Sequence, residues 1–300
     1  MKKRREQQVF IAAFLAPALI LYTLFVALPS VKALAYSLHR WDGLSAPVWT
    51  GLKNFIDMAH DSEAFLAALG HNVFLMTASG TLIMVLSLFF AAALHRRIRG
   101  ANLFRVAFFF PNIISSVAIA LLWMLLYSTT DFGVINGFLV WMEETLGWSP
   151  LHTPFPFLGK PYLIYAAVPI MVWTATGFYM VLFLAGMESI PETFYEAATL
   201  DGASSVAQFF YITLPLVREV LTVGLVFLVI GSLKAFDIIW VLDNGWPTTD
   251  THVLATLLYQ KVFNEYNVGY GSAIAVVLFL LVFAATLITL RLSRKEAMEY

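Results

Sequence analysis

The chain of 300 residues has no cysteine, and charged residues make up only 12% of it. The lack of cysteine excludes a disulfide framework, a thiol nucleophile and a Cys-ligated metal or iron–sulfur site. Average soluble domains carry about 25% charged residues, so this chain lacks the polar surface that a soluble enzyme requires. Its 18 Lys and Arg residues balance 19 Asp and Glu residues, which indicates no basic surface for nucleic acid. Because 60% of the residues are apolar, we expect an integral membrane protein.

Six apolar runs are long enough to cross a bilayer, which takes about 20 residues in a helix. Five contain no charged residue, and the fifth in chain order is interrupted only by Lys234 and Asp237. In lipid each backbone N–H must bond within its own segment, so we expect an all-α fold of six transmembrane helices. No internal repeat is evident, which predicts one domain over residues 1–300. The runs are Val9–Val31, Val73–Leu94, Val106–Tyr127, Pro161–Met187, Val220–Leu242 and Val268–Leu290.

Basic residues are concentrated on one side of these runs. The side that holds both termini carries Lys2–Arg5, the basic turn around Arg97 and the basic residues of Arg291–Lys295. Cytoplasmic segments of membrane proteins carry an excess of Lys and Arg, so we expect both termini in the cytoplasm. The segments around Ser37–Asn72 and Ser128–Lys160 are then external, and membrane lipid surrounds the spans.

The long cytoplasmic segment Glu188–Glu219 is not simply polar. Ser189 can cap a helix and Pro191 suits its first turn, while Gly202 can end it in the left-handed conformation. A second short helix can begin near Ser204, so we expect a helix–turn–helix. One interpretation is an amphipathic element resting on lipid headgroups. Such elements are usually rich in Lys and Arg, and this segment is acidic, so a surface that fits a protein groove is the other interpretation.

The motif EAATLDGA, followed at a distance by ITLP, resembles the EAA loop of permease subunits of binding-protein-dependent ABC importers. The longer string LAGMESIPETFYEAATLDGA resembles the carbohydrate-importing, maltose-type branch. Two departures affect only local loop geometry: Ser204 replaces a usual Gly, and Gly245-Trp246-Pro247 replaces a usual G-G-P turn. Further similar strings are GLKNF, FFFPN, W-x3-G-F (Trp173, Gly177, Phe178), AFDIIWVL and VGYGSAIAVVLFLL.

The resemblance implies a type I ABC importer permease fold and a transport subunit of an ATP-driven importer, not an enzyme. Its cargo would be a sugar or oligosaccharide that an extracytoplasmic binding protein delivers across the inner, cytoplasmic membrane of a prokaryote. The implied partners are a second permease subunit in a heterodimer, two ATPase subunits and the sugar-binding protein, with no nucleic acid. The chain has no G-x4-G-K-[ST] phosphate cradle, so ATP and Mg would bind the partner ATPase and no cofactor or metal would bind here.

The resemblance also implies two groups of site residues. The cytoplasmic loop, about residues 188–215, would couple the ATPase to the spans through Glu196, Ala197, Ala198, Asp201, Gly202, Ala203 and Pro215. The substrate path would be lined by Asn112, Ser116, Thr174, Phe178, Ser232, Lys234 and Ala235. From the residues alone, Lys234 and Asp237 are three apart and would share one helical face. They can form a structural ion pair or line the path, and both interpretations stay open.

Other functions remain as alternatives at this point. A similar permease can import glycerol-phosphate-type or other polar solutes, and the sequence does not name the cargo. An intramembrane enzyme is disfavoured because the chain has no H-E-x-x-H motif and its six His residues are scattered. A secondary transporter driven by an ion gradient would predict inverted repeats.

Overall fold

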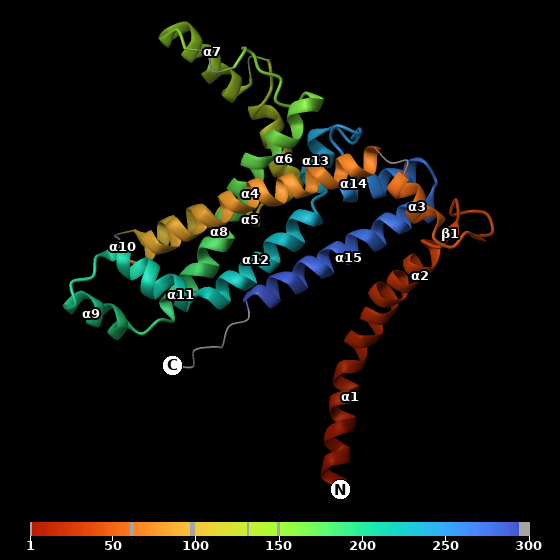
Figure 1. Ribbon diagram of the computed structural model, residues 1–300, viewed down its shortest axis with the longest axis horizontal. Coiled ribbons are helices and arrows are strands. Elements are labelled where there is room, and N and C mark those ends of the chain that lie inside the picture. The colour runs from red at the N-terminus through yellow and green to blue at the C-terminus, as the bar shows by residue number, and fades with distance from the viewer. Residues whose placement is uncertain (1, 61–62, 97–99, 131, 149–150, 294–300) are drawn as a thin grey trace. The chain divides into compact units, whose positions relative to one another are not determined.

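The computed structural model describes residues 2–60, 63–96, 100–130, 132–148 and 151–293 (Figure 1). These residues are predominantly helical, and the strands among them form a single two-stranded antiparallel sheet, so the all-α prediction is confirmed. The chain divides into two compact units, Met1–Ser62 with Leu258–Phe279 and Glu63–Leu257 with Leu280–Tyr300. Each unit is described by itself, and the prediction of one domain over residues 1–300 stays a prediction.

The first unit consists of helices and a short hairpin. The hairpin pairs His39 with Trp49 and Arg40 with Val48. Asn54, 7% exposed, holds the hairpin through its amide, whose Nδ2 donates to Ser37 O at 2.8 Å and to His39 O at 2.9 Å. The elements are α1 (Lys2–Tyr22), η1 (Thr23–Ala27), α2 (Leu28–Tyr36), β1 (His39–Arg40), β2 (Val48–Trp49), α3 (Lys53–His60), η3 (Gln260–Asn264) and the first part of α15 (Val268–Ser293).

The second unit carries the candidate site and is built on two long helices that lie side by side, α4 (Glu63–His95) and α8 (Lys160–Glu188) (Figure 1). Ser87 of α4 donates to the carbonyl of Thr176 in α8 at 2.9 Å. The remaining elements are α5 (Ala101–Ile113), α6 (Ser116–Leu126), α7 (Val134–Leu146), α9 (Glu192–Leu200), α10 (Ser205–Gln208), η2 (Phe209–Thr213), α11 (Leu214–Leu216), α12 (Arg218–Leu233), α13 (Asp237–Leu242) and most of α14 (Leu254–Tyr259).

Two hydrophobic clusters hold this unit together along α8. One gathers buried side chains of α4, α6, α8 and α13 around Ile170, and the other gathers α4, α8 and α12 around Phe183. Gly177 lets α5 approach α8, because a Cβ at this position would lie 1.9 Å from the carbonyl oxygen of Phe108. Small residues at helix contacts serve such close packing in membrane proteins.

Five described segments are long and apolar enough to cross a membrane, and the bent pair α5–α6 makes a sixth if it is one span. The span predicted over Val106–Tyr127 is not one continuous helix, because α5 and α6 meet at 97°. Pro111 lies inside α5, and the break comes after it, where Ile114 and Ser115 are extended with ψ of 143° and 133°. The fifth predicted span is also interrupted, since α12 ends at Leu233 and α13 begins at Asp237.

Candidate functional site

The two interrupted spans meet at their breaks. Helices α6 and α13, which follow the breaks, pack against each other. Ser116, the first residue of α6, donates its Oγ–H to Oδ2 of Asp237, the first residue of α13, at 2.6 Å. A helix break leaves backbone N–H and C=O groups without helical partners, and such groups line binding sites in many transporters. The structure therefore places polar side chains and released backbone groups together within the apolar spans.

The predicted path residues of the third and fourth spans lie beside this junction. The Asn112 Nδ2 donates to the carbonyl of Thr174 at 3.5 Å, a long contact that ties α5 to α8. The Thr174 hydroxyl donates to carbonyls one turn earlier in its own helix, at 2.9 and 3.0 Å. Phe178 is half-buried in the second hydrophobic cluster, with its ring 5.2 Å from and perpendicular to that of Tyr179. Asn112 is exposed and Ser116 half-buried.

The predicted path residues of the fifth span fall at the end of α12. Ser232 is only 5% exposed, Ala235 is half-buried and Lys234 is exposed. The prediction that Lys234 and Asp237 share one helical face is wrong, because the helix ends between them. Within the described residues no ion pair joins these two side chains, and the carboxylate of Asp237 accepts from Ser116 instead. A role of Lys234 in the path stays a prediction.

One residue that the sequence interpretation missed holds the break in the fifth span. Asn72, 0% exposed, donates from Nδ2 to the carbonyl of Ser232 at 3.0 Å and to that of Leu233 at 3.4 Å. Its Oδ1 accepts from the backbone N–H of Leu254 at 2.8 Å, at the start of α14. One amide thus bonds to carbonyls at the end of one helix and to a free N–H at the start of another. In the sequence, Asn72 stands out only as an amide directly before the apolar run Val73–Leu94.

The loop of residues 188–215 has the predicted helix–turn–helix. Helix α9 ends in a Schellman motif, in which Gly202 has φ +80° and donates to Thr199 O at 3.0 Å. The next N–H, of Ala203, bonds to Ala198 O at 2.9 Å. Ser204 caps α10 by accepting from the N–H of Ala207 at 3.3 Å, so the prediction of a second helix near this residue is confirmed.

The start of α9 differs from the expectation. Ser189 does not cap it, since this residue follows α8 and donates its hydroxyl to the carbonyl of Gly186 at 2.7 Å. Pro191 stands at the N-cap position, with ψ of 134°, rather than inside the first turn. The acidic side chain that favours the helix N-terminus is that of Glu192, as expected.

The predicted coupling residues form an exposed surface on this loop. Glu196, Ala197, Asp201 and Gly202 are exposed, Ala198 and Ala203 are half-buried, and Pro215 lies exposed in α11 just before α12. The loop is held together by hydrogen bonds within itself, from Gln208 Nε2 to Thr199 Oγ1 at 3.0 Å and between the hydroxyls of Tyr195 and Thr213 at 2.9 Å. Small side chains over the exposed face allow a partner to approach closely.

A cavity of about 900 Å³ lies between this loop and the ends of the long helices. Its wall includes the ion pair of Arg105 with Glu188, whose Nη2 and Oε1 are 2.5 Å apart, together with Tyr195 and Gln208. The loop therefore does not pack tightly along its whole length against α4, α5 and α8. Among the described residues, no group of three or more His, Cys, Asp or Glu side chains could hold a metal ion.

The chain is similar to known transport proteins along most of its length. The family model described as "Binding-protein-dependent transport system inner membrane component" matches residues 83–297. The chain is 34% identical over 284 residues to the trehalose/maltose transport system permease protein MalF of Thermococcus litoralis, covering 93% of this chain and 91% of that protein. It is 30% identical over 283 residues to the multiple sugar-binding transport system permease protein MsmF of Streptococcus mutans, covering 94% of each.

A solved structure has the same fold. A chain from the crystal structure of a bacterial ABC transporter involved in the import of the acidic polysaccharide alginate superposes with a TM-score of 0.80 and 23% identity, covering 97% of this chain and 99% of that one. The predicted permease fold and the resemblance based on the EAA motif are thereby confirmed. The chain is a multi-pass transport subunit rather than an enzyme, and it belongs to the family of binding-protein-dependent transport system inner membrane components.

Proposed function

We propose that this chain is the permease subunit of an ATP-driven importer that moves a sugar or oligosaccharide across the cytoplasmic membrane of a prokaryote. The observation that carries the proposal is the similarity, over more than nine tenths of the chain, to relatives named for trehalose, maltose and multiple-sugar transport. An extracytoplasmic binding protein delivers the cargo. A second permease completes a heterodimer, and two ATPase subunits bind ATP and Mg beneath it.

The geometry at the two helix breaks supports a path for a polar cargo. Sugar hydroxyls need both donors and acceptors, and the junction offers the amide of Asn112, the hydroxyl of Ser116 and the carboxylate of Asp237, while Lys234 lies exposed at the end of α12. In our proposal these groups, with Thr174, Phe178, Ser232 and Ala235, line the route. Hydrogen bonds between the two helix breaks, such as that from Ser116 to Asp237, are replaced by hydrogen bonds to the cargo as it passes.

The exposed loop surface is the proposed contact with the ATPase. Glu196 and Asp201 present carboxylates on α9 and at its end. Charge-assisted hydrogen bonds from basic groups of a partner would be roughly twice as strong as neutral ones. The Schellman turn at Gly202 fixes the direction in which the chain leaves α9, and Pro215 joins the loop to α12. The loop would thereby transmit ATPase motion to the broken fifth span.

The function is tested in liposomes that contain the complete importer with its binding protein. We expect ATP-dependent uptake of at least one of trehalose, maltose or diacetylchitobiose. Asn112→Trp and Ser232→Trp should abolish uptake while complex assembly and basal ATP hydrolysis persist. Unchanged uptake in both variants would assign these residues to helix packing. Uptake driven by an ion gradient without the ATPase would contradict the importer itself.

The proposed orientation, with both termini in the cytoplasm, has its own test. Because the chain contains no cysteine, single cysteines report which side of the membrane a residue faces. A cysteine at Asp57 should react with an impermeant thiol reagent in intact cells, and one at Gln208 should not. Labelling at Gln208 in sealed cells would reverse the orientation.

A further inference from the structure

The segment between α13 and α14, residues 243–253, is held in one conformation by buried hydrogen bonds. Thr251, 0% exposed, donates to Oδ2 of Asp243 at 2.5 Å and accepts from the N–H of Thr248 at 2.9 Å. On the side of α4, His71 Nδ1 bonds to the carbonyl of His252 at 2.8 Å. A carbonyl only accepts, so Nδ1 of His71 is the donor in this bond.

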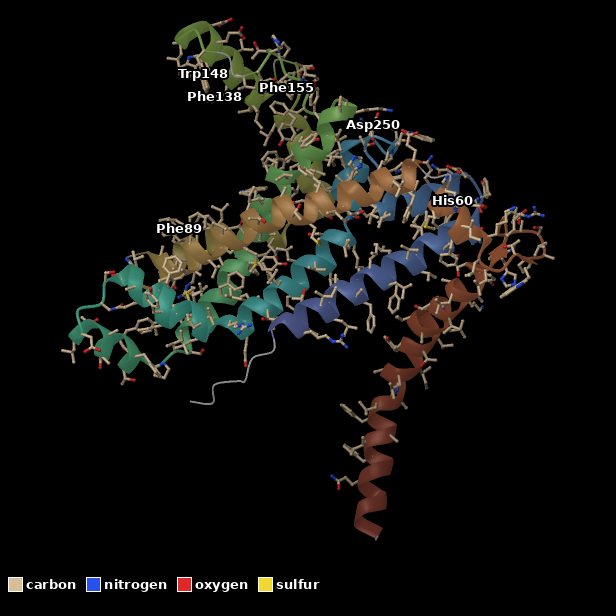
Figure 2. The ribbon with its side chains drawn as sticks, viewed as in Figure 1. His60, Phe89, Phe138, Trp148, Phe155 and Asp250 are labelled. Carbon is tan, nitrogen blue, oxygen red and sulfur yellow. The ribbon has the colours of Figure 1, made fainter. Side chains whose placement is uncertain are left out.

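A cavity of about 280 Å³ lies beside this segment, formed by side chains that are far apart in the chain. In the orientation proposed above it is at the extracytoplasmic end of α4 and α8, and we call it the outer cavity. Figure 2 labels Asp250 on the segment that closes one side of it. Its lining residues are His71, Phe74, Pro161, Ile164, Tyr165 and Asp250.

The lining combines aromatic surface with polar groups that accept hydrogen bonds. The rings of Phe74 and Tyr165 meet edge to face, 5.0 Å apart at 70°, and Tyr165 is 60% exposed. Asp250, with its carboxylate, and Tyr165, with its phenol, line the same cavity and can accept hydrogen bonds, and the imidazole of His71 is a further polar group in the lining. Pro161 and Ile164 add apolar surface at the start of α8.

This chemistry fits one class of ligand best. A pyranose ring has C–H faces that pack on aromatic rings and hydroxyls at its edge that donate to carboxylate and imidazole. The cavity volume of about 280 Å³ lies just below the range of pockets for drug-sized ligands, which is roughly 300 to 1,000 Å³. The cavity is therefore suited to a small ligand such as a single sugar ring. A phosphate or carboxylate ligand is disfavoured, because neither Lys nor Arg is among the described residues that line the cavity.

We propose that the outer cavity is a binding subsite for a single pyranose ring of the imported saccharide. It is separate from the junction of the two helix breaks: Tyr165 lies nine residues before Thr174 on α8, which places the two side chains about 180° apart around the helix. The proposal rests on the proposed function, because it takes the cargo to be a sugar. The bonds that hold residues 243–253 in place make the subsite preformed, so binding does not require the segment to order.

The test uses a cysteine reporter in the cavity wall. In the assembled importer, Pro161→Cys is labelled with a small methanethiosulfonate reagent in the presence of maltose, trehalose or diacetylchitobiose. We expect at least one sugar to slow labelling, and Tyr165→Ala in the same chain to weaken this protection roughly fivefold to tenfold, as expected for loss of an aromatic contact. Asp250→Asn should also weaken the protection of the cysteine by sugar.

Matched controls separate this result from general effects. Phe89 is an exposed aromatic residue on α4 that does not line the cavity (Figure 2), and Phe89→Ala should leave protection of the reporter unchanged. A cysteine at Glu144, exposed on α7, should be labelled at the same rate with and without sugar.

Two results would overturn the subsite. One is no protection by any of the three sugars at saturating concentration. The other is that Tyr165→Ala and Asp250→Asn abolish docking of the sugar-free binding protein, which would make the cavity a socket for a side chain of that protein. Failure of the proposed function looks different, because the wild-type importer would then take up none of the sugars.

Discussion

The segment 243–253 and the loop 189–215 both connect helices of the spans, but they satisfy their polar groups in different ways. In segment 243–253, Thr251 and His252 are almost completely buried, and α4 bonds to the segment through His71 and to Leu254, just after it, through Asn72. The loop is shaped by bonds within itself, and Leu200 and Tyr211 are 90% and 83% exposed. The first segment is folded against its own chain, whereas the second leaves its surface exposed, which in our proposal is the contact with the ATPase.

This difference predicts opposite responses to mutation. Where buried polar groups depend on one another, loss of a partner leaves an unsatisfied group and lowers the stability of the fold. Where an exposed loop depends on local backbone geometry, a substitution changes the presented surface and leaves the fold intact. The changes below, ordered from the largest expected effect to the smallest, test this distinction.

Gly202→Val should have the largest effect, and on coupling rather than on stability. Gly202 has φ +80°, and no atom lies within 4 Å of a Cβ placed on it, so the cost comes from the backbone conformation. A β-branched residue held at this φ would cost about 1–3 kcal/mol, so we expect the exposed turn to relieve the strain by changing direction. We expect loss of sugar-stimulated ATP hydrolysis and weaker recovery of the ATPase in pull-downs, with an unchanged melting temperature of the permease.

Gly202→Asn is the matched control, because Asn tolerates the left-handed region far better than Val, and it should retain most of the coupling. Glu196→Lys tests the same surface by charge reversal and should weaken ATPase association. Normal association and stimulation in both Gly202→Val and Glu196→Lys would make this loop a surface helix only, and the comparison between the two loops would fail.

Asn72→Leu should give the largest loss of stability. The change leaves two carbonyls at the end of α12 and the N–H of Leu254 without their amide partner. A buried group without a partner costs roughly 1–3 kcal/mol, so the unfolding midpoint of the purified protein in detergent should fall clearly. Thr77→Val, an exposed change on the same helix, is the control and should shift the midpoint little.

Thr251→Val tests segment 243–253 directly and should destabilise it by about 1–2 kcal/mol, because the isosteric change removes only the hydroxyl. The lost bonds are those to Asp243 and from the N–H of Thr248. Local hydrogen exchange of residues 243–253 should rise, while ATPase association is unchanged. Thr249→Val, in the same segment, should have no comparable effect; equal exchange in both variants would show that the segment does not depend on the buried hydroxyl.

The smallest expected effect is on the pH dependence of the folding stability in acid. Burial raises the pKa of Asp243 above its usual 3.8, against the opposing influence of the bond from Thr251 and the charge of Lys160. The folded state therefore binds this proton more readily than the unfolded state, so the contribution to stability is present below pH 3.8 and is lost as pH rises through the raised pKa. Asp243→Asn should remove this component of the pH dependence, measured by thermal unfolding.

Asp42 is the matched comparison, because its pKa is shifted in the opposite direction to that of Asp243. Backbone N–H groups of Ser45 and Leu44 bond to its carboxylate and lower its pKa to about 2. Its stabilising contribution is present above the usual pKa and is lost as pH falls towards about 2. Asp42→Asn should therefore weaken stability at neutral pH and bring the curve closer to wild type in acid. The same direction of change in Asp42→Asn and Asp243→Asn would contradict the assignment of the two environments.

Local features were predictable from the sequence because each depends on neighbouring residues. The apolar runs specify helices that cross a membrane, since lipid allows few other backbone conformations. The end of α9 at Gly202 and the cap at Ser204 follow from backbone preferences within a few residues. The EAA string identified the family for the same reason, since its residues are contiguous.

The tertiary structure alone decided the features that join distant segments. The 97° bend after Ile113 is a feature of the folded chain, in which α13 packs against α6. At this contact the bond from Ser116 to Asp237 joins residues that are 121 positions apart in the chain. Asn72 bonds to Ser232, 160 residues away, and looked like an isolated amide at the edge of an apolar run. Hydropathy and periodicity describe the surroundings of a residue along the chain, whereas a buried polar group is stabilised by whichever donor or acceptor the fold brings to it.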